Sequence, residues 1–231
     1  MLDVMIAEDN LPISVHLSNT ISISQSVRCV GILNDGAKVY QKIRELNPDV
    51  LILDLKMPGE NGLQILEKVK ADKQIRTKIF IYSGESEYME LAREYECIDR
   101  FISKLTPAEQ VAKELEKLEI EQSNKYLEEK IIDILFKIGF SYSLKGTRLM
   151  WEAIQYSIEE SEDSIENIYQ KIAKLHKENV YTVKSDINTA IKNMWRFTDR
   201  EKTRKILRLG QSDKPSAKNI LSMIAYYVRN K

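Results

Sequence analysis

The chain has 231 residues, with 35 basic and 35 acidic side chains and 43% hydrophobic residues, so its formal net charge is zero. This balance is typical of a folded protein and argues against disorder and against a uniformly basic coat for nucleic acid. The length fits one large or two small domains, and we expect two.

Neither secretion nor membrane insertion is indicated. Three acidic residues within the first nine are incompatible with the basic start of a signal peptide. The longest uncharged stretch, residues 10–27, is rich in Ser, Asn and Thr, so we expect no membrane span. Cys29 and Cys97 lack the spacing of a metal site, and two reduced thiols in a cytoplasmic protein are expected.

The zero net charge is a cancellation between segments. Residues 1–104 and residues 105–130 each carry a net charge of −3, whereas residues 131–231 carry +6. Such an asymmetry is a hint of an acidic regulatory part joined to a part that meets polyanions.

Up to residue 104, short apolar runs alternate with segments of helical spacing. The apolar runs predict five strands, at residues 4–7, 27–32, 50–53, 78–82 and 98–103. Strands that alternate with helices, some of them apolar throughout, are typical of a parallel sheet covered on both faces. We therefore expect a doubly wound, flavodoxin-like α/β domain with a five-stranded parallel sheet.

Helical patterns replace the strand-like runs further along the chain. The spacing predicts helices at residues 126–138, 146–159, 164–176, 182–196, 201–208 and 216–229. A stretch dominated by Glu, Lys and Gln, without Gly or Pro, precedes them and indicates a polar linker of helix-forming composition. The predicted organisation is an α/β domain over residues 1–120, a linker over residues 121–130 and an all-α domain over residues 131–231.

Five polar residues stand where strands of the predicted sheet end. Ligands bind outside the carboxyl ends of the strands in open α/β sheets, and the residues there are Glu8, Asp9, Asp54, Ser83 and Lys104. Carboxylates gathered in one crevice repel one another unless a cation shares the site, and an oxygen-only set suits Mg²⁺. Asp54 would then act as a nucleophile toward a phosphoryl donor. Ser83 would hydrogen-bond the phosphoryl oxygens and Lys104 would neutralise them.

Other interpretations of these five residues remain open. One interpretation is that they are independent surface acids and strand-end caps. Another is a Mg²⁺-dependent phosphatase, but the second set of substrate-binding residues that such an enzyme needs is missing from the sequence. The joint occurrence of these residue types at the strand ends favours one shared site. The run Leu53–Gly59, followed by Gly62, adds a tight turn that holds Asp54 at the crevice.

With this set of motifs, about 120 residues resemble the receiver domain of two-component response regulators. The resemblance implies that Asp54 accepts a phosphoryl group and that Ser83 and Lys104 sense it. It also implies a Mg²⁺ site whose ligands are Asp9, Asp54 and the backbone carbonyl of Lys56, with Glu8 acting through water.

Two positions near the last predicted strand bear on signalling. Phe101 matches the aromatic switch position of the receiver family, with a core phenylalanine as the alternative. The family usually has proline after the lysine, joined by a cis peptide bond, but this chain has Leu105. Because a cis bond before a non-proline residue costs roughly 2.5–4 kcal/mol, either that strain is retained or Lys104 is aimed differently.

Two consecutive predicted helices bear on whether the basic segment could bind DNA. The helices at 164–176 and 182–196 are about five residues apart, with apolar stripes of Ile165, Ile168, Ile172 and Leu175 and of Val183, Ile187, Ala190, Ile191 and Met194. A plain helical bundle is one interpretation. A helix-turn-helix is the other, with outward residues able to contact bases and phosphates, namely Thr182, Lys184, Ser185, Asn188, Thr189, Lys192 and Arg196. Beyond them, Arg200, Lys202, Arg204, Lys205 and Arg208 are available for contacts with the DNA backbone.

The basic segment also resembles the C-terminal domain of the sporulation-initiation regulators, the stage-zero sporulation protein A family. The matching residues include Gly139, Gly146, Tyr169, Trp195 and Pro215. The resemblance implies a six-helix DNA-binding domain that docks in tandem after receiver dimerisation. The outward face lacks the several arginines of that family and the linker is short, so a divergent paralogue with another preferred site is expected.

These features predict a non-enzymatic, phosphorylation-controlled transcription regulator. Its expected partners are a histidine kinase or phosphotransfer protein, double-stranded DNA and, on activation, a second copy of the chain. The alternative is an atypical, phosphorylation-independent receiver protein that modulates a related regulator through protein contacts.

Overall fold

The computed structural model describes residues 1–84, 86–160 and 164–229, in two compact units, Met1–Gln122 and Ser123–Lys231. The last two residues of the predicted DNA-binding domain, Asn230 and Lys231, lie outside the described residues. None of the described helices is long and apolar enough to cross a membrane.

The first unit is built on a five-stranded parallel sheet in the order β2-β1-β3-β4-β5. Its strands are β1 Leu2–Ala7, β2 Val27–Leu33, β3 Val50–Leu53, β4 Lys78–Ser83 and β5 Ile98–Ser103. The central strand β3 is buried along its whole length, which explains its continuous apolar sequence. The predicted α/β fold class is confirmed, and each predicted strand is found within two residues of its expected ends.

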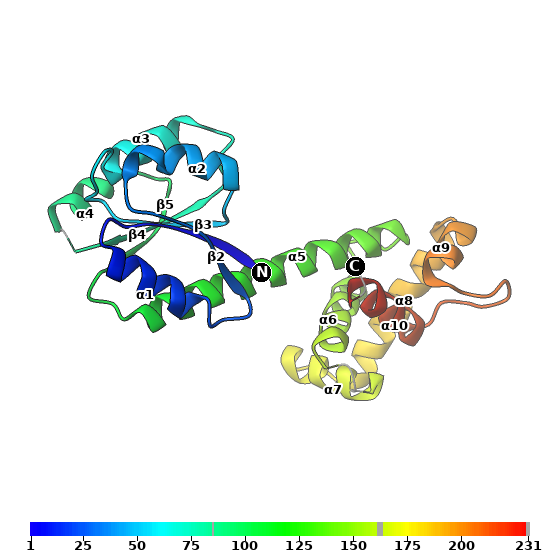
Figure 1. The fold of residues 1–231 in the computed structure, drawn as a ribbon. Coiled ribbons are helices and arrows are strands. Elements are labelled where there is room, and N and C mark those ends of the chain that lie inside the picture. Colours follow the sequence, from blue (N-terminus) through cyan, green and yellow to red (C-terminus); the bar gives the residue numbers. More distant parts are fainter. Residues whose placement is uncertain (85, 161–163, 230–231) are drawn as a thin grey trace. The chain divides into compact units, whose positions relative to one another are not determined.

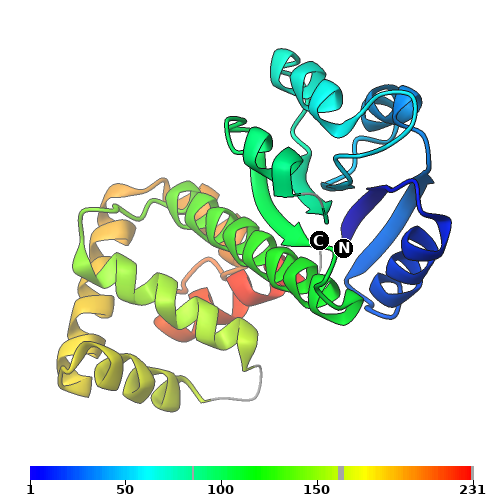
Figure 2. The ribbon, with the colours of Figure 1, turned by 90° about the vertical axis from the view of Figure 1, so that its left-hand side faces the viewer.

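Helices cover both faces of this sheet (Figure 1, Figure 2). One face packs against α1 Leu11–Ile21 and the first part of α5. The other face packs against α2 Val39–Leu46, α3 Gly62–Ala71 and α4 Ser86–Ala92, with a short 3₁₀ helix, Gly36–Lys38, before α2. Two separate apolar layers therefore hold the sheet, and its polar strand ends stay free for a site.

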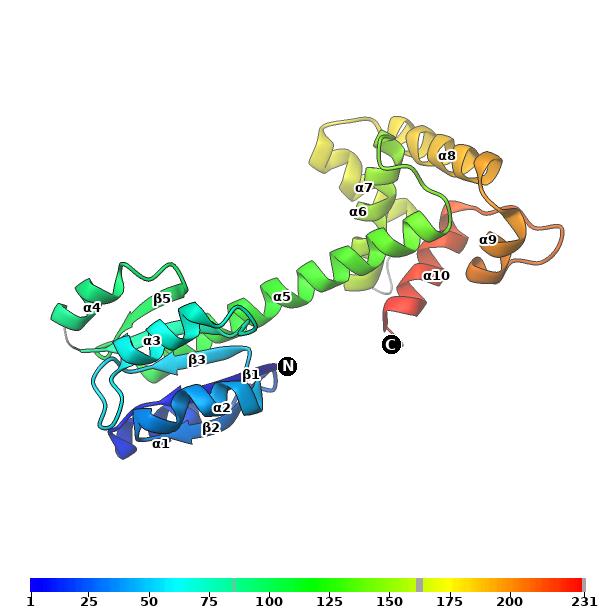
Figure 3. The same cartoon turned by 90° about the horizontal axis from the view of Figure 1, so that it is seen from above.

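Helix α5 runs without a break from Ala108 to Lys137 (Figure 3). The separate helix predicted at 126–138 is therefore wrong, and the predicted linker, residues 121–130, is helical. The cause is local: the stretch holds many Glu, Lys and Leu residues and no Gly or Pro, so nothing in it ends a helix.

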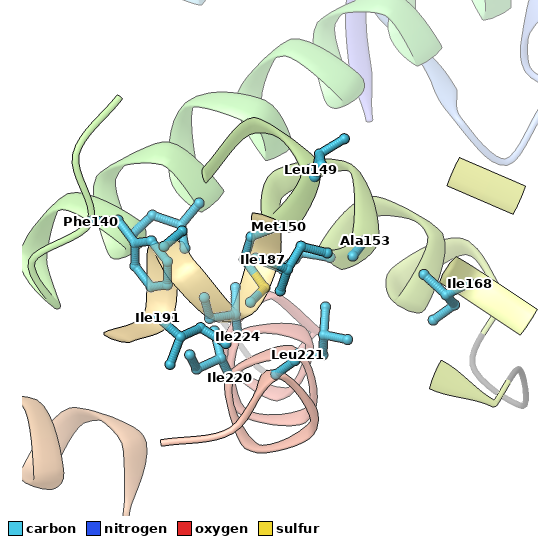
Figure 4. Packing of buried hydrophobic residues seen from close by; sticks show 14 of the residues in the cluster. Phe140, Leu149, Met150, Ala153, Ile168, Ile187, Ile191, Ile220, Leu221 and Ile224 are labelled. Atoms are coloured by element: carbon cyan, nitrogen blue, oxygen red, sulfur yellow. The ribbon is translucent and has the colours of Figure 1, made fainter. Parts of the chain in front are cut away.

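The second unit is all-α among the residues that the structure describes. After the end of α5 it contains α6 Lys145–Glu159, α7 Ile165–His176, α8 Val180–Phe197, α9 Arg200–Leu207 and α10 Ala217–Arg229. Its core gathers side chains of α6, α8 and α10, with Met150, Ile187 and Ile224 among them (Figure 4).

Glycine permits a close contact between α6 and α8 in this unit. A Cβ on Gly146 of α6 would lie 1.9 Å from the carbonyl oxygen of Asp186 on α8. The two backbones therefore meet at a point that only a residue without a side chain allows, and this contact sets the position of α8.

Candidate functional site

Lys104 links two buried carboxylates at the carboxyl edge of the sheet. Its Nζ lies 2.7 Å from Oδ2 of Asp54 and 2.8 and 2.9 Å from the two carboxylate oxygens of Glu8. The side chains of Glu8 and Asp54 are 1% and 3% exposed, whereas Asp9 is exposed. The strand ends that the sequence predicted to converge therefore do so for these four residues.

The backbone explains why these residues meet. The amide of Asp54 donates to the carbonyl of Ala7, and the amide of Glu8 donates to the carbonyl of Leu33, so β1, β2 and β3 end at the same level. The chain does fold back after Asp54, but through a loop over residues 56–61 that is wider than the expected tight turn, and the amide of Gly62 closes it by donating to the carbonyl of Leu55.

The pKa values of Glu8 and Lys104 are both raised by their surroundings. Burial raises the pKa of Glu8 and the charge of Asp54 adds to this, although the hydrogen bond from Lys104 opposes it. Burial alone would lower the pKa of Lys104, but the hydrogen bonds to Asp54 and Glu8 outweigh it and raise that pKa. Lys104 is thus held as an ammonium ion beside Asp54.

The missing proline does not keep Lys104 out of the crevice. The described part of the chain contains no cis peptide bond, so Lys104–Leu105 is trans. Leu105 projects into solvent at 93% exposure, while the lysine side chain reaches both carboxylates. Of the two alternatives for this position, a retained cis bond is therefore wrong.

The three carboxylates suit a divalent cation. Glu8, Asp9 and Asp54 each offer an oxygen, and these oxygens all lie within 4.8 Å of one another. Oε2 of Glu8 accepts no hydrogen bond from the described residues, although the ammonium of Lys104 lies 2.8 Å from it as an ion-pair partner. A small all-oxygen set with one exposed member fits Mg²⁺, which keeps several water ligands.

Of the remaining predicted site residues of this unit, Ser83 is buried, whereas Lys56 and Phe101 are exposed. Ser83 ends β4 and is completely buried, and its carbonyl accepts from the amide of Lys104. Lys56 lies in the loop after Asp54 with an exposed side chain. Phe101 is 41% exposed on β5, so the alternative of a core phenylalanine is wrong.

Asn34 supports the site and was missed by the sequence reasoning. Its Nδ2 donates to the carbonyl of Glu8 and to the hydroxyl of Ser14. The backbone amide of Asn10 donates to Oε1 of Glu8, and the side chain of the same asparagine caps α1. The available signal was an asparagine directly after β2, Asn34, and one three residues after β1, Asn10.

In the second unit, α7 and α8 form a helix-turn-helix with a tighter turn than predicted. Only Lys177–Asn179 separate the helices, and Lys177 takes a left-handed conformation with φ of 54°. The side chain of Asn179 accepts from the amide of Tyr181, so α8 begins at Val180 instead of Thr182. Leu175, expected in the apolar stripe of α7, is 61% exposed, and Tyr169 and Ala173 are buried instead.

Most of the predicted outward residues of α8 do face solvent. The exposed ones are Thr182, Ser185, Asn188, Thr189, Lys192 and Arg196. Lys184 is half-buried and forms an ion pair with Glu166. Tyr181, at the start of α8 and 82% exposed, was not anticipated, because the predicted helix began after it.

Comparisons with known protein families agree with both units. Residues 4–116 match the family model of the response regulator receiver domain. Residues 131–228 match the family model of the sporulation initiation factor Spo0A C terminal.

Curated relatives match over part of the chain. A protein-glutamate methylesterase/protein-glutamine glutaminase from Methanospirillum hungatei is 32% identical over 93 residues, 40% of this chain and 27% of that protein. The oxygen regulatory protein NreC of Staphylococcus aureus is 35% identical over 91 residues, 38% of this chain and 42% of that protein. The chain thus spans less than half the length of these relatives.

Solved structures resemble the chain over about half its length. A DNA-binding response regulator of the LuxR family from Staphylococcus aureus covers 52% of this chain and 99% of its own, at 25% identity and a TM-score of 0.47. The two family matches together extend from residue 4 to residue 228. The chain therefore combines a response regulator receiver domain with a DNA-binding C-terminal domain of the Spo0A type.

Proposed function

We propose that this protein is a phosphorylation-controlled transcription regulator in which Asp54 accepts the phosphoryl group and α8 binds DNA. The observation that carries the proposal is that the side chains of Glu8, Asp9, Asp54 and Lys104 come together at the carboxyl edge of the sheet. We assign residues 1–120 to the regulatory role and residues 131–231 to DNA binding. Residues 121–130, the middle of α5, join them.

Asp54 is suited to act as the nucleophile. Its carboxylate attacks the phosphorus of a phosphohistidine, a phosphorus–oxygen bond forms, and the bond to the histidine nitrogen breaks. Lys104 is already 2.7 Å from Oδ2 of Asp54, so its ammonium can transfer its hydrogen bond to a phosphoryl oxygen. The buried Ser83 at the end of β4 would donate its hydroxyl to another phosphoryl oxygen.

The acidic residues would hold a magnesium ion during this reaction. Asp9, Asp54 and the carbonyl of Lys56 are the proposed ligands, with Glu8 acting through water. Bound there, Mg²⁺ offsets the negative charge that builds up on the phosphoryl group. Phe101, exposed on β5, is the proposed switch residue that responds to the change at Lys104.

Helix α8 is proposed to read the major groove of DNA. Side chains that can hydrogen-bond bases and phosphates line its exposed face, from Thr182 to Arg196. Activation would pair two receivers through a dimer and bring two such helices to one DNA. A histidine kinase or phosphotransfer protein in the cytoplasm would supply the phosphoryl group. We propose no enzymatic activity on a separate substrate.

Mass spectrometry after incubation with acetyl phosphate and Mg²⁺ tests the first half of this proposal. One phosphoryl group is expected on the wild type and none on Asp54→Asn. Fluorescence anisotropy with a mixed-sequence DNA duplex tests the second half, and binding should weaken steeply as salt rises. Lys192→Gln, on the exposed face of α8, should weaken it further.

A second candidate function is an atypical receiver protein that acts on a related regulator. It is favoured by Leu105, a fully exposed leucine where the family has proline. An unmodified wild-type mass combined with no DNA binding at low salt would support this candidate and overturn the first.

A further inference from the structure

Three arginines form one face of the short helix α9. Arg200, Arg204 and Arg208 are spaced four residues apart, so their side chains lie along the same side of the helix and its end. Lys202 and Lys205 point from another side. The sequence alone marks all five as basic, and the structure separates them into two groups.

Aromatic rings hold these arginines in place. The guanidinium carbons of Arg200 and Arg204 lie 5.7 and 5.2 Å from the ring centre of Trp195. The guanidinium of Arg208 lies 5.0 Å from the ring centre of Tyr226 on α10. A guanidinium stacked on a ring is oriented in advance, so it loses less conformational freedom when it binds an anion.

No carboxylate neutralises these guanidinium groups among the residues that the structure describes, and the Nε atom of Arg204 is buried without a hydrogen-bond partner. Some other cations of this unit are paired, for example Lys145 with Glu178 and Asp186, and Lys205 with Glu201. The arginine face therefore keeps its charge available.

The arginine face continues the exposed side of α8. Asn188, Lys192 and Trp195 are spaced as neighbours on one side of that helix. Since Arg200 and Arg204 stack on Trp195, their guanidinium groups lie at the edge of the surface proposed to meet DNA. Helix α9 follows α8 after only Thr198 and Asp199 (Figure 3).

We propose that Arg200, Arg204 and Arg208 form a phosphate clamp that grips the DNA backbone beside the groove occupied by α8. This inference rests on the proposed DNA-binding function. It assigns the backbone contacts to the ring-held arginines and excludes the exposed lysines of the same helix. Planar guanidinium groups match phosphate oxygens with two parallel hydrogen bonds, which a lysine cannot form.

The test measures how binding of the full chain to a mixed-sequence DNA duplex depends on salt. Each lost phosphate contact makes the slope of log affinity against log salt concentration less steep by about 0.9. The pair Arg200→Gln and Arg204→Gln should therefore flatten the slope by roughly 2. The matched control, Lys202→Gln with Lys205→Gln, removes the same charge from the same helix and should leave the slope nearly unchanged.

Arg208→Gln is a further variant for the case that the double arginine variant does not fold. Arg208 is exposed at the end of α9, and its replacement should flatten the slope by roughly 1. Equal effects of the arginine and lysine pairs would overturn the clamp, because net charge alone would then explain binding. If the wild type binds DNA and Lys192→Gln weakens it while all arginine variants match the lysine control, only the clamp fails. A wild type that ignores DNA at low salt overturns both proposals.

Discussion

Lys104 reaches the site although the residue after it, Leu105, is not the proline expected there. The leucine at position 105 left open where the ammonium would point, because side-chain direction depends on the peptide bond and on the partners available. The partners decide the outcome here. Two buried carboxylates draw the ammonium inward, and the exposed Leu105 is carried outward.

Removing this ammonium should destabilise the first unit. Lys104→Met leaves Glu8 and Asp54 buried and facing each other without a cation, which should lower the free energy of unfolding by about 3–5 kcal/mol in metal-free buffer. Mg²⁺ should restore more stability to this variant than to the wild type, because the ion becomes the only local cation. Urea unfolding with and without MgCl₂ measures both effects.

Lys117→Met is the matched control for that experiment. The exposed Lys117 pairs with Glu114, which also keeps Arg100 as a partner, so loss of Lys117 should change stability by less than about 1 kcal/mol, with or without Mg²⁺. A Lys104→Met protein as stable as the wild type in metal-free buffer would show that the ammonium does not offset the two carboxylates.

At the scale of elements, the strands and the helices α6 to α10 were predictable to within two residues, whereas the unbroken α5 was not. Strand β3 is buried on both faces, so Val50–Leu53 reads as an uninterrupted apolar run. The start of α8 depends on the cap formed by Asn179, and the unbroken α5 depends on the absence of a stop signal in a polar stretch. Both are short-range effects that leave the apolar spacing unchanged, so periodicity did not find them.

The contact between α6 and α8 yields a prediction at this scale. The Cβ of Gly146→Ala would lie 1.9 Å from the carbonyl oxygen of Asp186, so the helices must separate. Overpacking of this kind costs about 1–3 kcal/mol, and the better helix propensity of alanine, about 1 kcal/mol, offsets part of it. Chemical unfolding of the variant should show a less stable second unit and weaker DNA binding.

Two controls define that result. Phosphorylation of Asp54 by acetyl phosphate should be unchanged in Gly146→Ala, because the first unit has its own core. Arg148→Ala, on the exposed side of α6, should stay within about 0.5 kcal/mol of the wild type. Wild-type stability and DNA affinity in Gly146→Ala would mean that α8 does not depend on this close approach.

At the scale of the whole molecule, the sequence predicted which chemistry each part carries but not how individual charges are used. The division into −6 over residues 1–130 and +6 over residues 131–231 follows from counting. Counting charges does not show that Lys184 forms an ion pair with Glu166 while Arg204 stacks on Trp195, because those contacts join residues from different helices. Tertiary packing decides which basic residues remain available to DNA.

The proposed function requires that phosphorylation of the first unit changes DNA binding by the second. If phosphorylation acts through a receiver dimer, the second DNA-binding unit is held near the DNA once the first has bound, and its effective concentration rises. Phosphorylation should then raise affinity for a duplex of several helical turns by roughly 100-fold or more. Affinity for a duplex of a single turn, about 10 base pairs, should stay unchanged because it accommodates one unit.

Anisotropy titrations with both duplexes, before and after treatment with acetyl phosphate, measure this difference, and light scattering reports the dimer. Asp54→Asn is the control and should show the low affinity under both conditions. An equal gain on the short and long duplexes would instead indicate that phosphorylation changes the affinity of each DNA-binding unit by itself. In that case the next hypothesis to test is that the negative charge of residues 1–130 inhibits DNA binding by residues 131–231. Added salt should weaken this inhibition because it screens the charges.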